Sequence, residues 1–164
     1  MKFIIPIEPT AQMRARHAVR GSYATTYKAP EQRQREDTLN AFLARHQPAT
    51  PLPGPLFLGV RAYLAAPKTK PKWFTGSTAE YRLFVQRDVI LPPVKPDLDN
   101  LVKQIKDCMT QCRYWGDDKQ VVGFLPGTGK FYSDRPRWEI EIVPYDWRQN
   151  VNAVTGRLSL MENA

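Results

Sequence analysis

The sequence predicts an α+β domain in which helices pack on one face of a mixed β-sheet. Two stretches alternate apolar and polar residues, as half-buried strands do, and two others repeat apolar residues every three or four positions, as amphipathic helices do. Proline and glycine clusters separate these stretches. The expected order is strand, helix, strand, helix, strand, strand. With 164 residues, we expect one domain over residues 1–145 and a polar tail over residues 146–164.

The first half of the chain supplies two strands and one helix. Residues 2–7 are expected to form a short strand, and residues 10–29, which show no steady period, a long loop. Pro30 suits the first turn of a helix that continues over residues 31–46. After a proline-rich break, residues 56–64 alternate apolar and polar side chains and predict a half-buried strand.

The second half contains the clearest helix. Residues 67–96 are expected to form a long connection, rich in Pro and Lys, with a weakly ordered centre over residues 75–87. Asp97 is a natural N-cap for a helix whose apolar stripe extends to Cys112. Two further strands follow, with a turn directly after the first of them, and we expect them over residues 120–125 and 137–142.

The cysteine content indicates a reducing compartment. Cys108 and Cys112 lie on the apolar face of the second predicted helix, far in sequence from both histidines, so we expect two buried thiols and neither zinc nor a disulfide. No apolar run approaches 18 residues, and the N-terminus is too short and too early charged for a signal peptide. We therefore expect a protein of the bacterial cytoplasm with no membrane partner.

The charge balance indicates a polyanionic partner. Formal net charge is +8 and the sequence pI is about 9.7. Lysines gather with Trp73 and Phe74 in an acid-free stretch, and arginines gather near the N-terminus. Such runs are often only solvated surface, and that interpretation stays open; phosphate contact is the alternative. The candidate DNA-contact residues are Arg14, Arg16, Lys68, Lys70, Lys72 and Lys95.

Carboxylates concentrate around the second predicted helix. Asp97 and Asp99 stand at its start, and Lys103 and Asp107 follow Asp99 at four-residue steps on one polar stripe. A second acidic pair, Asp117 and Asp118, comes just after the helix. Mg²⁺ prefers oxygen ligands and uses one or two carboxylates plus phosphate oxygens. Such a metal polarises a phosphodiester and lowers the pKa of an attacking water, and a nearby lysine stabilises the added negative charge.

Each of these carboxylates also has a structural interpretation. Asp97 alone is more often a helix cap than a ligand, and adjacent aspartates after Gly116 are ordinarily a surface turn. Asp99 and Lys103 could form a plain helix ion pair. The joint arrangement favours a cation, because like charges this close are unfavourable unless a positive charge lies among them.

At these residues the chain resembles the RusA family of Holliday junction resolvases. The resemblance covers residues 95–122 and lies in Asp97-Leu98-Asp99-Asn100-Leu101, Lys103, Trp115 and Asp117-Asp118 with Gln120-Val121. It implies a small homodimeric, Mg²⁺-dependent endonuclease that cuts four-way DNA junctions. It also implies that Asp97, Asp99 and Asp118 bind the metal and that Lys103 is essential for DNA cleavage. Members of the family are commonly encoded by prophages, so the resemblance implies that origin as well.

Two alternatives of other classes stay open. The first is a non-catalytic DNA-binding protein with structural aspartates. Its affinity for DNA would fall steeply with salt but would not depend on Mg²⁺, and it would leave the DNA intact. A glycosyltransferase-like use of the Asp-x-Asp pair lacks support from any glycine-rich nucleotide loop, and 164 residues is short for that chemistry. The working hypothesis is therefore a junction-cutting nuclease with paired, symmetric nicks.

Overall fold

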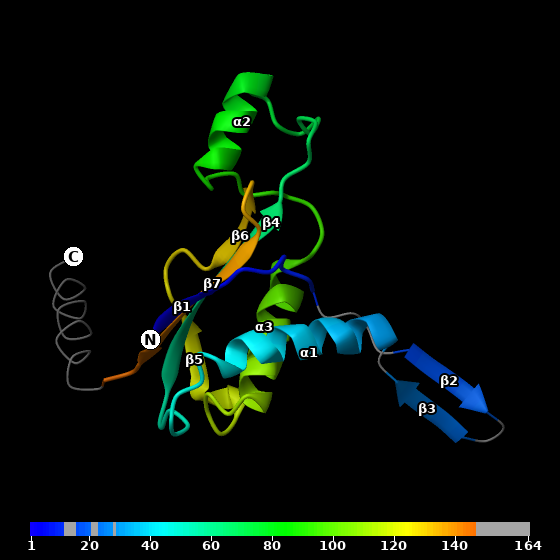
Figure 1. The fold of residues 1–164 in the computed structure, drawn as a ribbon, viewed down its shortest axis with the longest axis vertical. Helices are drawn as coiled ribbons and strands as arrows, with labels where there is room; N and C mark the ends of the chain where they lie inside the picture. The colour runs from blue at the N-terminus through cyan, green and yellow to red at the C-terminus, as the bar shows by residue number, and fades with distance from the viewer. Residues whose placement is uncertain (12–15, 21–22, 28, 147–164) are drawn as a thin grey trace, which may run out of the picture.

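The computed structural model describes the backbone of residues 1–11, 16–20, 23–27 and 29–146, and side chains of the first and last of these ranges. A five-stranded mixed sheet with helices against it confirms the predicted fold class (Figure 1). The elements, in chain order, are β1 (Lys2–Ile5), β2 (Arg16–Arg20), β3 (Tyr23–Tyr27), α1 (Pro30–Ala44), β4 (Leu56–Ala65), α2 (Thr78–Gln86), α3 (Leu98–Gln111), a short 3-10 turn η1 (Asp118–Gln120), β5 (Val121–Phe124), β6 (Gly129–Ser133) and β7 (Arg137–Pro144).

Strand β4 is the centre of the sheet. Its neighbour β7 runs antiparallel to it, and β7 pairs on its other side with β1. The remaining edge of β4 is shared: β5 pairs with its first residues and β6 with its last five, both in parallel. Between them the turn stays attached to β4, because the Val60 amide donates to Thr128 Oγ1 at 3.3 Å. Thr128 is thereby fixed beside the sheet.

The main core lies between this sheet and two helices. Alternation along β4 and β7 sends Leu58, Val60, Ile140 and Ile142 to the same face, where all four are fully buried. Helices α1 and α3 cover this face with one apolar stripe each, and Trp115 and Trp138 complete the core. The stripe of α3 is the one predicted from the sequence, and its position determines which of its residues face outward.

The far end of the sheet carries a second, smaller core. Tyr81 and Val85 of α2 pack with Leu64 of β4 and Tyr132 of β6. Figure 1 shows α2 beyond the end of β4 and β6, away from α1 and α3. The two cores therefore divide the molecule into a main body and an outer lobe.

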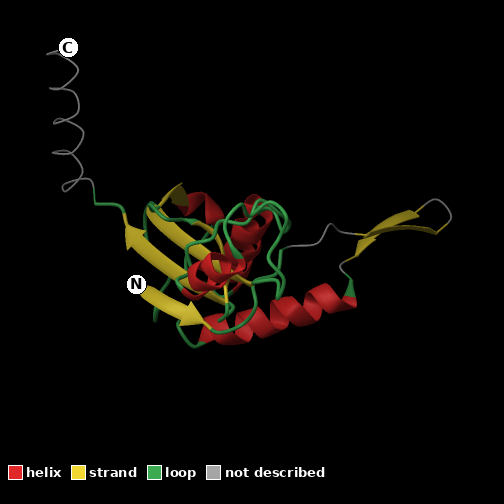
Figure 2. Cartoon of the chain, turned by 90° about the horizontal axis from the view of Figure 1, so that it is seen from above, coloured by secondary structure: helices red, strands yellow, loops and turns green. Residues whose placement is uncertain are grey.

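The expectation of a loop over residues 10–29 was wrong. Strands β2 and β3 form an antiparallel hairpin with Arg16 opposite Tyr27 and Arg20 opposite Tyr23. The hairpin projects away from the body beyond the start of α1 (Figures 1 and 2). The two strands pair with each other, and neither carries a long run of alternating apolar and polar residues, so a search for that period missed them.

The expected connection over residues 67–96 also contains a helix that was missed. Helix α2 begins with a capping box, in which Ser77 and Glu80 exchange side-chain to backbone hydrogen bonds at 3.2 and 2.7 Å. The Ser-x-x-Glu signal was visible in the sequence. Strand β6 was missed as well, so the predicted element order lacked a helix and three strands.

The thiol prediction was correct for one cysteine and only partly correct for the other. Both cysteines are free; Cys108 is fully buried, whereas Cys112 is half-buried. Burial raises the pKa of the Cys108 thiol to about 12. None of the described helices is long and apolar enough to cross a membrane.

Candidate metal and nucleic-acid site

A cavity of about 510 Å³ opens between α3 and the β5–β6 edge of the sheet. Its polar lining comes from Asp99, Lys103 and Lys106 on α3, Asp118 on η1 and Thr128 on the turn before β6; Leu98, Val102 and Phe124 supply its apolar wall. Phe124 is 53% exposed even though it stands on a sheet strand. Asp118, which sequence alone could not place, therefore lies in the same cavity as Asp99 and Lys103.

Asp97 stands next to this cavity rather than in it. It is the N-cap residue of α3, as predicted, but its side chain makes no capping hydrogen bond. It lines a neighbouring hollow with Lys95, Pro96 and Asn100. Asp97 is exposed, and because its carboxylate has no capping role it can contact another partner.

The two adjacent aspartates after α3 have different surroundings. Asp117 caps η1: the Lys119 amide donates to Asp117 Oδ1 at 2.9 Å, and this hydrogen bond lowers the pKa of the Asp117 carboxyl. Gln120 completes the capping box. Asp118 instead lines the cavity, with its Oδ2 3.4 Å from Lys106 Nζ. The geometry therefore separates a structural aspartate from one that faces the cavity.

Lys106 was absent from the sequence-based site, whereas Asp107 was placed on the same polar stripe as Asp99 and Lys103. On an α-helix, a residue seven positions on lies roughly 20° from the starting direction, whereas one eight positions on lies roughly 80° away. Lys106 follows Asp99 by seven positions and Asp107 by eight, so Lys106 reaches the cavity and Asp107 does not line it. Counting helical angles, rather than steps of four, would have found it.

Lys130 is a second residue that the sequence reasoning missed. Its ammonium donates to the Pro96 carbonyl at 2.8 Å and also to the Val94 carbonyl. Both carbonyls belong to the segment that leads into Asp97, and the Lys95–Pro96 peptide within it is cis. Lys130 therefore links strand β6 by hydrogen bonds to residues 94–96, which precede α3.

The donor set fits a hard divalent cation in part. Within residues 1–11 and 29–146, no three His, Cys, Asp or Glu side chains come together as a ready metal cluster. Asp99 and Asp118 nevertheless share one cavity, and Asp97 lies two residues from Asp99. Mg²⁺ is commonly held by one or two carboxylates with substrate phosphates completing its shell, so two carboxylates in one cavity are compatible with this cation.

The basic residues expected to contact DNA lie in several places. Lys95 lines the hollow of Asp97. Lys68 and Lys72 are exposed on the connection that follows β4, and Lys70 donates to the Phe74 carbonyl at 3.0 Å, within the outer lobe. Of the two arginines, Arg16 begins β2 with its side chain undescribed, and Arg14 lies outside the described residues.

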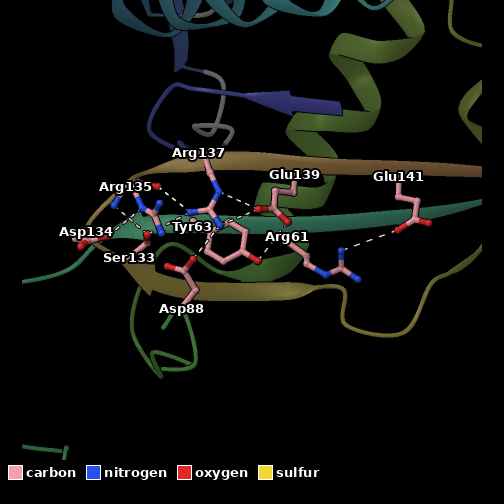
Figure 3. A network of polar contacts seen from close by, with 9 residues as sticks. All are labelled: Arg61, Tyr63, Asp88, Ser133, Asp134, Arg135, Arg137, Glu139 and Glu141. Carbon is pink, nitrogen blue, oxygen red and sulfur yellow. Dashed lines mark hydrogen bonds and ion pairs between the residues drawn. The ribbon is translucent and has the colours of Figure 1, made fainter. Parts of the chain in front are cut away.

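A second cluster of charges lies on the sheet face opposite the helices (Figure 3). Arg137 donates to Asp88 and Glu139 at 2.7–2.9 Å, and its guanidinium stacks 3.7 Å from the centre of the Tyr63 ring. Arg61 and Glu141 lie farther along the same face, 4.0 Å apart. This cluster is closely paired and half-buried, and none of its members lines the cavity beside α3.

Comparison with known proteins gives three matches. The family model described as "Endodeoxyribonuclease RusA" matches residues 6–143. An "Uncharacterized protein YqaN" of Bacillus subtilis (strain 168) is 30% identical over 142 residues, which cover 87% of this chain and 94% of the relative. A "Crossover junction endodeoxyribonuclease rusA" of Lactococcus phage r1t is 35% identical over 89 residues, 54% of each chain.

Proposed function

The chain belongs to the endodeoxyribonuclease RusA family, and we propose that it is a Mg²⁺-dependent endonuclease that resolves four-way (Holliday) DNA junctions by paired, symmetric nicks. Family membership gives the class, a nuclease. The name of the phage relative, a crossover junction endodeoxyribonuclease, supports the choice of junctions as substrate.

The observation that carries the proposal is the cavity beside α3. It gathers Asp99, Lys103 and Asp118, two carboxylates and an ammonium that the chain contributes from separate elements. In the described part of the chain, Asp99 and Lys103 make no ion pair with each other, so neither charge is neutralised by its neighbour on the helix. The two carboxylates are suited to a bound cation and the ammonium to a DNA phosphate, so the cavity is suited to a metal-bound phosphodiester.

The proposed roles follow from the side-chain chemistry. Asp97, Asp99 and Asp118 hold the cation; Mg²⁺ there would polarise the scissile phosphate and lower the pKa of the attacking water. Lys103 donates to the phosphate and stabilises the negative charge that develops on it during in-line attack. The products are a 5′-phosphate and a 3′-hydroxyl.

DNA binding is proposed to use the basic residues around this cavity. Lys95 lies beside Asp97, and the β2–β3 hairpin projects from the body with Arg16 on its first strand. A two-stranded ribbon has dimensions that fit the major groove. The lysines of the outer lobe, Lys68, Lys70 and Lys72, and the N-terminal Arg14 complete the proposed DNA-contact set.

Two nicks on a nearly twofold substrate are most simply made by a twofold enzyme, so we propose a homodimer. We further propose a prophage gene expressed in bacterial cytoplasm, which the free cysteines and the phage relative support. Light scattering at assay concentration tests the dimer, and a monomer there would contradict it.

The test of function uses a labelled synthetic four-way junction and a linear duplex of the same sequence, each with Mg²⁺ or EDTA. We expect paired nicks in the junction alone, in Mg²⁺ alone, and their loss in Asp99→Asn. Cutting of both substrates would remove junction specificity while retaining the nuclease. Tight binding without cleavage would instead favour a DNA-binding protein with structural aspartates.

A further inference from the structure

Lys106 stands where the proposed metal ligand and the proposed phosphate would meet. It lies on α3 one helical turn after Lys103, and both lysines line the cavity with Asp99 and Asp118. Lys106 Nζ is 3.4 Å from Asp118 Oδ2. The Lys106 side chain is only 21% exposed, so its ammonium is held at the cavity rather than extended into solvent.

The neighbouring Lys119–Asp117 pair provides a comparison, because it is an ion pair that does not line the cavity. Lys119 Nζ lies 3.4 Å from Asp117 Oδ2, the same separation as in the Lys106–Asp118 pair. Lys119, however, is 81% exposed, and Asp117 is already engaged as the cap of η1. This pair lines no part of the cavity and is an ordinary surface contact.

Electrostatics set the consequence for Asp118. An ammonium beside a carboxylate offsets part of the carboxylate's charge and repels a cation that approaches it. A DNA phosphate in the cavity offers the ammonium a new anionic partner, which releases the carboxylate. The two ligands therefore favour each other's binding through one lysine.

We propose that Lys106 is an internal counter-ion of the site: it neutralises Asp118 while DNA is absent and transfers to a backbone phosphate when DNA binds. This inference rests on the proposed function and adds its regulation. Cation binding is weak in the free protein and strengthens on DNA. Because such coupling is reciprocal, DNA binding also strengthens with the cation, each by a factor on the order of ten.

The experiment compares Lys106→Met with Lys119→Met, which removes the same charge from a pair of the same length. Mn²⁺ binding to the free protein is followed by electron paramagnetic resonance, and junction binding in EDTA by fluorescence anisotropy. For Lys106→Met we expect Mn²⁺ affinity to rise on the order of tenfold and junction affinity to fall. Lys119→Met is expected to leave Mn²⁺ affinity unchanged.

Opposite shifts of the two affinities are the signature that a merely structural lysine would not produce. Lys106→Arg keeps the charge and is expected to retain the weak Mn²⁺ binding of the wild type, which separates charge from packing. Unchanged or weaker Mn²⁺ binding in Lys106→Met would overturn the counter-ion role. Failure of the wild type to cleave junctions in Mg²⁺ would overturn the proposed function itself.

Discussion

The two charge clusters of this protein contrast in how well their charges are paired. Around Arg137, two carboxylates, a hydroxyl and an aromatic ring surround a single half-buried guanidinium, with contacts of 2.7–3.3 Å to the oxygens. In the cavity beside α3, two carboxylates and two ammoniums share one ion pair of 3.4 Å. The first cluster is densely paired within the chain, although Asp88 Oδ1 is buried with no hydrogen-bond partner among the described residues, and the second cluster is sparsely paired.

We take this difference as separating structural charges from those of the proposed site. A half-buried ion is stabilising only when its partners are well placed, and removing one partner leaves the others exposed to the desolvation cost. Poorly paired charges around an opening contribute little to stability and remain available to a ligand. Mutations in the two clusters should therefore affect different measurements.

The largest effect is expected from Asp118→Asn. Loss of one cavity carboxylate should lower the rate of junction cleavage by a factor on the order of 10²–10³. Thermal stability should barely change, because the Asp118 side chain is 51% exposed. Asp117→Asn is the matched control: asparagine can still accept the Lys119 amide, so most cleavage should remain. Equal losses in the two variants, measured on one labelled junction, would remove the distinction between these aspartates.

Arg137→Leu should show the reverse pattern. It leaves Asp88 and Glu139 without their cation, and we expect the free energy of unfolding to fall by about 2–3 kcal/mol, less than for a fully buried pair. Urea denaturation measures this change. Cleavage per folded molecule, assayed well below the unfolding midpoint, should stay near that of the wild type. A selective loss of cleavage at full stability would place Arg137 in the functional cluster.

The smallest effect is expected from Tyr63→Phe, which keeps the ring under Arg137 and removes the 3.4 Å hydrogen bond to Glu139. Stability at neutral pH should fall by about 0.5–1 kcal/mol. Burial and the nearby Glu139 raise the pKa of Tyr63. The neutral phenol therefore contributes stability below the unfolded-state pKa of about 10, and this contribution is lost as pH rises through the higher folded-state pKa. Tyr63→Phe should show less alkaline destabilisation than wild type in melts above pH 10.

The sequence was sufficient for the elements that form the main core. Alternation placed β4 and β7, and the apolar stripe placed α3, because burial imposes a period on the residues. The β2–β3 hairpin and β6 were missed because neither gives a long alternating run. Helix α2 was missed for another reason: its local signal, Ser77 and Glu80, is present in the sequence but was not used.

For the site, the sequence supplied the types of residue but not their arrangement. It could propose Asp118 as a partner of Asp99, whereas only the return of the chain through η1 brings both to one cavity. It could not separate Asp117 from Asp118, because capping depends on backbone conformation rather than on residue type. The role of Lys106 was within reach of helical geometry, yet its contact with Asp118 depends on tertiary structure.

The central position of β4 has a consequence for how the protein is made. All three strands that pair with β4 come from beyond residue 120, so the whole of residues 66–120 must be synthesised before any partner exists. At roughly 5–20 residues per second, the ribosome leaves this apolar strand unpaired for several seconds. During that interval, residues 56–65 are open to misassociation and offer an apolar segment that a chaperone can bind.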